Sequence, residues 1–328
     1  VVDTRGKELQ AFQLAADAQG DCRMLTLAQG QAAGVRIWAI EGAGGYGRGL
    51  ATHLIEQGER VVEIDRPKRP ARRNGAKSDA LDATRAAREY LAREQPAELR
   101  SRGAREAVRV VLRTRESAVR ARTQALNHLQ AMVTTAPERL RQKLRGLRSQ
   151  PLARRCARLR MAPAHTDEMR ATIIALRAIG RRIRQLNDEV EELDAELEPR
   201  VRELAPALLD EAGIGPINAA EIVCAWSHPG RVRSEAAFAA LAGVAPIPAS
   251  SGQTVRHRLN RSGDRKLNRA LHSAVLIRWA RHEETQRYVE RRRAEGKTDR
   301  EIRRCLKRHL ARRVFKLLEA GTRHSPAA

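Results

Sequence analysis

The stretch Val35-Arg-Ile-Trp-Ala-Ile-Glu-Gly-Ala-Gly-Gly-Tyr-Gly47 decides the fold of the first part of the chain. Its apolar run ends at Glu41 and predicts a buried strand, because a strand covered on both faces is short and continuously apolar. The segment from Gly49 to Gln57 is typical of a helix, and Arg60-Val-Val-Glu-Ile-Asp65 predicts the next strand. This order of strand, helix and strand predicts an α/β domain.

Gly42, Gly44 and Gly47 have the G-x-G-x-x-G spacing that binds dinucleotides when it lies between a strand and a helix. Two acids, Glu63 and Asp65, follow at about the right distance. Three observations oppose this interpretation: the α/β pattern stops after one more strand, the chain then becomes strongly basic, and the first strand ends in an acid. Dinucleotide binding is therefore the weaker interpretation of this turn.

The composition predicts a polyanionic partner. The chain has 328 residues, enough for two or three domains, with 63 Lys and Arg against 39 Asp and Glu and a net charge of +24. Nucleic acid is the preferred partner, because arginine dominates the excess and neutralised phosphates release counterions. A GC-rich genome would also raise the arginine content. A membrane surface is the competing polyanion, but no apolar run approaches the ~18 residues of a spanning helix.

The four cysteines, Cys22, Cys156, Cys224 and Cys305, are far apart and form no C-x-x-C pair. This spacing opposes a zinc site and a disulfide framework, and it predicts a reducing cytoplasm. Aromatic residues make up only 3% of the chain, so stacking of bases on aromatic rings is not the expected binding mode.

Three regions follow from the pattern along the chain: an α/β region at residues 1–97, a basic helical and coiled-coil region at 98–205, and a mostly helical region at 206–328. The basic linker Arg66-Pro-Lys-Arg-Pro-Ala-Arg-Arg73 breaks regular structure with two prolines. After it, Asp79 to Arg93 predicts a helix.

Residues 105–132 predict one strongly basic helix, and residues 183–204 predict a helix with a heptad-like apolar seam. The seam consists of Ile183, Leu186, Val190, Leu193, Leu197, Val201 and Leu204. Acidic residues crowd the polar face, which favours a protein–protein helix over a DNA-binding one. The sequence leaves two pairings open, a helical hairpin inside the chain and a contact between subunits.

Thr298 and Glu301 form a capping box that predicts the start of the last helix, and Gly321 marks its end. One face of this helix is apolar, with Ile302, Leu306, Leu310 and Val314. The other face is basic, with Arg303, Arg304, Lys307, Arg308, Arg312 and Arg313. A helix that faces phosphate is the preferred interpretation, and a solvated face is the alternative.

Asp79 and Asp82 lie three residues apart and share one face of a helix. Together with Glu41 at the strand end they could hold Mg²⁺, which prefers a few carboxylates with water and phosphate oxygens. On spacing alone the two aspartates are better explained as an N-cap and a first-turn acid that favours the helix dipole.

Gly213-Ile-Gly-Pro216 lies between two helical segments and looks like a helix-hairpin-helix element. Glycines at such a turn let backbone N–H groups approach phosphate without reading sequence. A plain tight turn between packed helices is the alternative.

The loop Pro246-Ile-Pro-Ala-Ser-Ser-Gly252 places two hydroxyl residues before a glycine. A basic run follows at once, with Arg256, Arg258, Arg261, Arg265 and Lys266. A hydroxyl beside dense positive charge suits attack on a phosphodiester. A serine-protease arrangement has weak support, because His257 is the only histidine nearby.

Together these pieces closely resemble the DEDD transposases of the insertion-sequence one-ten family, the RNA-guided serine recombinases related to Piv-type invertases. The matching segments occur in the family's order and cover most of the chain. They are Ala39-Ile-Glu-Gly-Ala-Gly-Gly-Tyr-Gly47, Val61-Val-Glu-Ile-Asp-Arg66, Gly75-Ala-Lys-Ser-Asp-Ala-Leu-Asp-Ala83, Gly213-Ile-Gly-Pro216, Phe238-Ala-Ala-Leu-Ala-Gly-Val-Ala-Pro246 and Ser250-Ser-Gly252.

The resemblance implies a RuvC/RNase H-like N-terminal domain, a helical coiled-coil insertion and a mostly α C-terminal transposase domain. Glu41, Asp79 and Asp82 match the second, third and fourth acids of the DEDD set, which implies bound Mg²⁺. Ser251 matches the family's nucleophilic serine, with Ser250 as the second choice. The resemblance also implies a structured bridge RNA, donor and target DNA, homodimers that pair into tetramers, and a location at the bacterial nucleoid.

One departure concerns the first acid of the family pattern. Asp3 stands closer to Glu41 than that acid does, and Val1-Val-Asp-Thr-Arg-Gly6 resembles the end of the second strand and its turn. The opening strand and first aspartate therefore have no counterpart here. A misplaced start, a decayed gene and a recruited Asp3 are the three explanations, and only the last adds Asp3 to the metal ligands.

We expect a Mg²⁺-dependent enzyme that cuts and rejoins DNA through a covalent phosphoserine link. The alternatives are an inactive nucleic-acid-binding remnant of a mobile element and a RuvC-like nuclease that needs only the carboxylates. The expected nucleic-acid-binding residues are Arg72, Arg73, Lys77, Gly213, Gly215, Arg256, Arg258, Arg261, Arg265 and Lys266.

Overall fold

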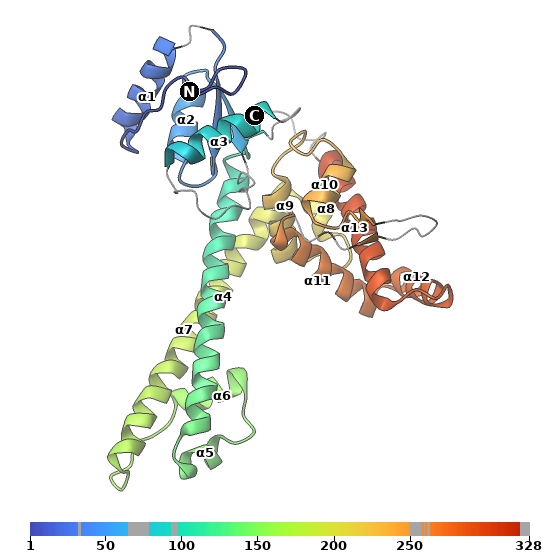
Figure 1. Ribbon diagram of the computed structural model, residues 1–328. Helices are drawn as coiled ribbons and strands as arrows, with labels where there is room; N and C mark the ends of the chain where they lie inside the picture. Colours follow the sequence, from blue (N-terminus) through green and yellow to red (C-terminus); the bar gives the residue numbers. More distant parts are fainter. Residues whose placement is uncertain are drawn as a thin grey trace. The chain divides into compact units, whose positions relative to one another are not determined.

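The computed structural model describes residues 1–31, 34–64, 79–92, 98–249, 257–258, 260 and 263–321. The chain forms two compact units, whose elements are labelled in Figure 1. The first unit contains Val1–Ser101 and the short segment Ser227–Arg233. The second contains Arg102–Trp226 and Ser234–Ala328, so both predicted helical regions lie almost wholly within one unit.

A parallel pair of strands forms the centre of the first unit. β1 spans Ile37–Glu41 and β2 spans Arg60–Ile64, with the two strand ends Glu41 and Ile64 opposite each other. α2 (Arg48–Glu56) joins them, as parallel strands need a crossover connection. The order of strand, helix and strand confirms the sequence prediction, but β1 is not the buried strand predicted: Ile37–Ile40 are half-buried and Glu41 is exposed, because a pocket lies along this strand. Asp65, predicted to end the second strand, lies outside the described residues.

α3 (Asp79–Leu91) packs on this sheet and confirms the helix predicted to begin at Asp79. Its buried Ala86 contacts the buried Val62 and Ile64 of β2. The small side chain of Ala86 meets the β-branched side chains of Val62 and Ile64. This packing holds the first turn of α3 close to the ends of the strands.

Two features lie at the N-terminal end of the first unit. Val2 pairs with Glu8 in an isolated antiparallel bridge, which agrees with the predicted turn but does not add residues 1–6 to the sheet as the end of a strand. α1 (Ala18–Gln31) has no counterpart among the predicted helices. The Asp17 carboxylate accepts a hydrogen bond of 2.8 Å from the backbone N–H of Gly20 and so caps this helix.

Two long helices dominate the second unit. α4 (Ala104–Thr135) and α7 (Asp167–Leu204) run side by side in opposite directions in Figure 1. α5 (Glu138–Leu144) and α6 (Ser149–Ala157) lie at the far end of this hairpin and close its core. Gly180 lets α6 and α7 approach closely, since a Cβ there would lie 2.7 Å from the Ala153 carbonyl oxygen.

The heptad-like seam is buried inside the chain. Ile183, Val190, Leu197 and Val201 are at most 4% exposed without any partner subunit. α7 packs on α4, and the Asp194 carboxylate on its acidic face pairs with an arginine of α4. The intramolecular interpretation of the seam is therefore confirmed.

Short helices and one strand pair complete the second unit. The helices are α8 (Pro206–Leu209), α9 (Pro216–Trp226), α10 (Glu235–Leu241), α11 (Arg265–Arg281), α12 (Glu283–Ala294) and α13 (Asp299–Gly321). The predicted capping box opens α13, where Thr298 N–H donates to Glu301 Oε2 at 2.9 Å and Glu301 N–H donates back to Thr298 Oγ1 at 3.4 Å. α13 is described as far as Gly321, the predicted stop, and residues 322–328 lie outside the described residues.

Buried carboxylates paired with arginine hold the second unit together. Glu211 is 6% exposed and accepts from Arg278 and Arg313. Glu221 is 5% exposed and pairs with Arg113 at 3.0 Å. Part of the arginine excess therefore neutralises acids inside the protein, as buried charges require.

Two further predictions from the sequence concern the cysteines and membrane-spanning helices. All four cysteines are free thiols, in agreement with the predicted absence of a disulfide framework. Burial raises the pKa of Cys156 and of Cys224 to about 11, so both stay protonated at neutral pH. In the part of the chain that the structure describes, no helix is both long and apolar enough to span a bilayer.

Candidate functional site

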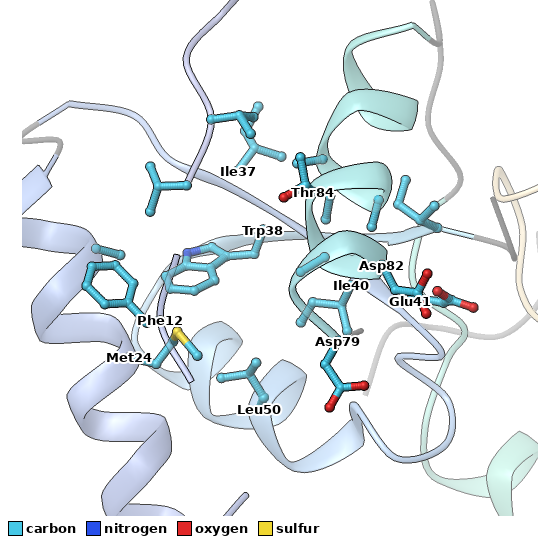
Figure 2. Close-up of a pocket in the computed structure, with 18 of the residues that line it drawn as sticks. Phe12, Met24, Ile37, Trp38, Ile40, Glu41, Leu50, Asp79, Asp82 and Thr84 are labelled. Carbon is cyan, nitrogen blue, oxygen red and sulfur yellow. The ribbon is translucent and has the colours of Figure 1, made fainter. Parts of the chain in front are cut away.

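A pocket of about 1130 Å³ lies in the first unit, along β1 and the first turn of α3 (Figure 2). One side of this pocket is apolar, with Phe12, Met24, Trp38 and Leu50. The other side carries the carboxylates of Glu41, Asp79 and Asp82. The fold therefore brings the three predicted acids to one pocket, although Glu41 lies far from Asp79 and Asp82 in the sequence.

The elements that carry these acids explain the arrangement. Glu41 is the last residue of β1, and Asp79 and Asp82 lie in the first turn of α3, which packs against that strand. Glu41 and Asp79 are exposed, and Asp82 is half-buried and pairs with Arg85 at 3.1 Å. Acids in a first turn also suit the helix dipole, so the two explanations offered for Asp79 and Asp82 are compatible.

The donor set suits a hard cation. Among the described residues, no three His, Cys, Asp or Glu side chains stand close enough to form a ready-made metal cage. Mg²⁺ rarely needs such a cage, because it keeps several waters and uses one or two carboxylates together with substrate phosphates. Exposed carboxylate oxygens in one pocket fit that kind of site, in which the substrate completes the ligand set.

Glu63 is a further acid of this pocket. Its spacing from the glycine turn suggests only a role in dinucleotide binding. It lies on β2 with 3% exposure, and it pairs with Arg100 at 2.5 Å and with Arg231 at 3.6 Å. Arg231 comes from the segment 227–233, which returns to the first unit. The sequence offers one clue, an acid within an apolar strand, because a buried acid needs a partner.

The segment 227–233 is fixed by hydrogen bonds within the first unit. The backbone N–H of Ser101 donates to Ser227 Oγ at 2.8 Å, and a His228 ring nitrogen lies 2.9 Å from the Leu99 carbonyl oxygen. Arg231 Nε donates to the Glu98 carbonyl at 3.2 Å. These contacts hold the guanidinium that neutralises Glu63.

Packing explains the glycine spacing after β1 without a nucleotide. A Cβ at Gly47 would lie 2.6 Å from the Ile40 side chain, so only glycine lets the chain turn back over β1 here. The backbone N–H of Gly45 donates to the Gly42 carbonyl at 2.7 Å and closes the turn. Because Glu63 is held by two arginines, it is not a free acid for a ribose.

The expected nucleophile lies in a segment bounded by a strand pair. β3 (Ile247–Pro248) pairs with β4 (His257–Arg258) in antiparallel register. Ser250, Ser251 and Arg256 fall between these strands and lie outside the described residues, as does Arg261. The strand pair brings the two ends of the serine segment together.

The remaining predicted DNA contacts have different environments. Arg258 and Arg265 are exposed, whereas Lys266 pairs with Glu116 of α4. Gly213 packs against α11, because a Cβ there would lie 2.7 Å from the Ala274 carbonyl oxygen, and Gly215 faces open space. The helix before this turn, α8, has only four residues, so the first helix of the helix-hairpin-helix-like element is short. Arg72, Arg73 and Lys77 lie outside the described residues.

Asp3 has a local structural role. Its Oδ1 accepts hydrogen bonds of 2.9 Å from the backbone N–H groups of Arg5 and Lys7, which closes the turn between Val2 and Glu8. It is not among the residues that line the pocket. The described contacts therefore give no support to its recruitment as a metal ligand.

Comparisons with known proteins place both units in one class. A family model described as "Transposase", for the DEDD domain of IS110 elements, matches residues 1–136. A second model, described as "Transposase IS116/IS110/IS902 family", matches residues 205–290. No curated protein matches the chain.

These matches, together with the acidic pocket, define a DNA transposase. The chain belongs to the IS110 family of DEDD transposases, which confirms this part of the resemblance stated from the sequence. Its two-stranded parallel sheet and many helices are compatible with an RNase H-like DEDD domain and a helical C-terminal domain. DEDD domains of transposases usually work with divalent metal ions, which agrees with the donor set of the pocket.

Proposed function

We propose that this protein cuts and rejoins DNA through a covalent phosphoserine link, with Ser251 as the nucleophile and Glu41, Asp79 and Asp82 as acids that hold Mg²⁺. The observation that carries the proposal is the convergence of these three acids on one pocket. They come from a strand end and a helix start, and Glu41 and Asp79 are exposed to incoming substrate.

The covalent step conserves the energy of the phosphodiester. Ser251 Oγ forms a bond to phosphorus while the bond from phosphorus to one strand oxygen breaks, and that oxygen departs as a hydroxyl. The serine proton passes to a pocket carboxylate and then to the departing oxygen. A second strand hydroxyl attacks the phosphoserine in the reverse step, so rejoining needs no external energy source.

Positive charge is needed because the phosphate gains negative charge as Oγ approaches. Bound Mg²⁺ would supply that charge on both the attacking and the departing oxygens. The ions would be held by Glu41, Asp79 and Asp82. The arginines that follow Ser251 in the sequence would stabilise the pentacovalent transition state at phosphorus. The strand pair of β3 and β4 supports this assignment, because it holds Arg258 at the base of the serine segment.

The proposal includes a structured RNA partner and assembly into dimers and tetramers, as the family resemblance implies. The net charge of +24 supports a nucleic-acid partner. Sequencing of RNA that co-purifies with the protein tests this part. A single abundant structured RNA is the expected result, and a random mixture of cellular RNA would contradict it.

The test of the nucleophile is strand joining on DNA that carries the element's own ends. Ser251→Ala should abolish joining and covalent adducts while DNA and RNA binding persist. Ser250→Ala is the matched control and should keep most of the activity. A Ser251→Ala protein that still cuts DNA fully would instead identify a RuvC-like nuclease, which needs only the carboxylates. A wild-type protein that binds DNA but never cuts it would identify an inactive remnant.

A further inference from the structure

A cluster of basic side chains lies between α11 and α13 in the second unit. The cluster consists of Arg265 and His272 on α11 and Arg303, Arg304 and Lys307 on α13. The two helices pack against each other, and Lys307 Nζ donates to Asn268 Oδ1 of α11 at 3.3 Å. Asn268 is anchored in turn, since its amide donates to the Ala242 carbonyl at 2.7 Å. Lys307 is thereby held in a defined place.

Acids neutralise the cluster only in part. Among the described residues, no carboxylate forms an ion pair with Arg265, His272 or Lys307. The acid nearest in sequence to Arg304 is Glu301, whose carboxylate is bound to Thr298 in the capping box. Arg303 donates to the Asp299 carbonyl oxygen and stacks 5.7 Å from the Trp279 ring. The pKa of Asp299 is lowered first by Arg293 and further by Arg303, and the pKa of Glu301 is lowered first by Thr298 and further by Arg304, so Arg303 and Arg304 are compensated in part. Arg265 and Lys307 form no ion pair with a carboxylate of the described residues.

Other basic residues of the same helix are neutralised. Arg308 and Arg312 both pair with Glu235, and Arg313 pairs with the buried Glu211. These three belong to the basic face that the sequence predicted to meet phosphate, and in the free protein each of them already has an acidic partner. Lys307, which forms no ion pair with a described residue, instead contacts α11.

The basic groups of the cluster lower one another's pKa. Burial lowers the pKa of Lys307, and the nearby Arg304 and Arg265 lower it further. Burial, followed by Lys307 and Arg303, lowers the pKa of His272, which is neutral at pH 7. Placing like charges together raises the free energy of the folded state. Binding of an external anion would reduce this repulsion.

We propose that the cluster between α11 and α13 binds a backbone phosphate of DNA. The Lys307 ammonium and the forked guanidinium groups of Arg265 and Arg304 offer donors to phosphate oxygens without contacting bases. The site deepens the proposed function, because it names a place where the DNA is held. It does not depend on Ser251, and the family assignment to a DNA transposase supplies the choice of DNA over other polyanions.

The test compares Lys307→Gln with Arg312→Gln in the full chain. Both remove one positive charge from α13, but Arg312 is already paired with Glu235. Binding to a fluorescent DNA duplex is measured without Mg²⁺ over a range of salt concentrations. Lys307→Gln should weaken binding about 3- to 10-fold and reduce the salt slope by about one, whereas Arg312→Gln should change affinity less than about 2-fold.

Thermal unfolding separates a binding role from a structural one. Lys307→Gln should unfold at the same or a higher temperature, because it removes like-charge repulsion and keeps a side chain that can bond to Asn268. Unchanged DNA affinity, an equal loss in both variants, or a clear drop in the unfolding temperature of Lys307→Gln would overturn the proposal. A loss seen with an RNA hairpin but not with the DNA duplex would overturn it as well.

Because this assay involves no strand cutting, its outcome is separate from that of the Ser251→Ala test. Weaker DNA binding by Lys307→Gln together with normal joining by Ser251→Ala would support the phosphate site and refute the nucleophile. The opposite pair of results would support the nucleophile and refute the phosphate site.

Discussion

The acids of the two units differ in what surrounds them. In the first unit, Glu41 and Asp79 stand exposed at a pocket, and neither forms an ion pair with any described residue. In the second unit, Glu211 and Glu221 are buried, and each contacts two arginines. Carboxylates therefore stabilise the fold in the second unit, whereas in the first unit Glu41 and Asp79 remain available to a cation.

Glu63 sharpens this contrast within the pocket itself. It lines the same pocket as Glu41, yet two arginines neutralise it. A buried carboxylate held by two arginines offers little to a metal ion, whereas Glu41 and Asp79 can bind one without first breaking an ion pair, and Asp82 would give up only its half-exposed pair with Arg85. The partners of an acid, more than its position in the sequence pattern, decide whether it stabilises the fold or is available to bind a cation.

The largest expected effect is on the stability of the second unit. Glu211→Ala should destabilise the protein by about 3–5 kcal/mol, because Arg278 and Arg313 lose a buried partner. Denaturant unfolding measures this change. Glu283→Ala is the control, since Glu283 forms an exposed pair with Arg287 that contributes about 0–1 kcal/mol. Equal effects of the two variants would remove the distinction between buried and exposed acids.

The pocket acids should behave in the opposite way. Replacing Asp79 and Asp82 together by Asn should lower strand joining by about 100-fold or more, because two of the proposed metal ligands are lost. Stability should change by less than about 1 kcal/mol, the range expected for first-turn acids. Joining assays at several Mg²⁺ concentrations and unfolding curves measure both quantities. Normal joining by the double variant would show that these acids only serve the helix.

A smaller effect is expected at the start of α13. Thr298→Ala removes the hydroxyl that bonds Glu301 in the capping box and should cost about 1 kcal/mol of stability. Thr172→Ala is a suitable control, because that exposed hydroxyl only bonds a carbonyl within α7. DNA binding at the α11–α13 cluster should fall only to the extent that the first turn of α13 unfolds. A drop as large as that of Glu211→Ala would indicate that α13 depends on its cap more than on its packing.

The smallest effect concerns acid pH. Burial alone would raise the pKa of Glu116, but hydrogen bonds from Lys266 and Arg113 outweigh burial and lower it below its ordinary value of 4.5. Because the folded state has the lower pKa, this stabilisation is fully present above about pH 4.5 and is lost as the pH falls through the folded value. Unfolding of Glu116→Gln should therefore depend less on pH below 4.5 than unfolding of the wild type. Identical pH profiles would show that the Lys266 contact is weak.

Local patterns predicted much of the fold. The apolar runs that became β1 and β2, the helix after the glycine turn, and the start of α13 all follow from residues close together in sequence. The meeting of Glu41 with Asp79 and Asp82 at one pocket was also predictable. Strand ends and helix starts gather at one edge of a parallel sheet.

Long-range contacts could not be predicted in this way. The pairing of Glu63 with Arg231 joins residues that no local pattern connects, and it depends on a return segment after α9. The pairing of Arg312 with Glu235 likewise neutralises part of a face that, in the sequence, looks free to bind phosphate. Arginine content indicates the charge of a chain, but only the fold shows which charges are already compensated.

The most direct test of the central claim is mass spectrometry of protein–DNA adducts formed on the element's own ends with Mg²⁺. The account predicts a nucleotide linked to the peptide that contains Ser251, absent from Ser251→Ala and strongly reduced when Asp79 and Asp82 are both Asn. An adduct on a different residue, or efficient strand joining with no adduct at Ser251, would contradict it.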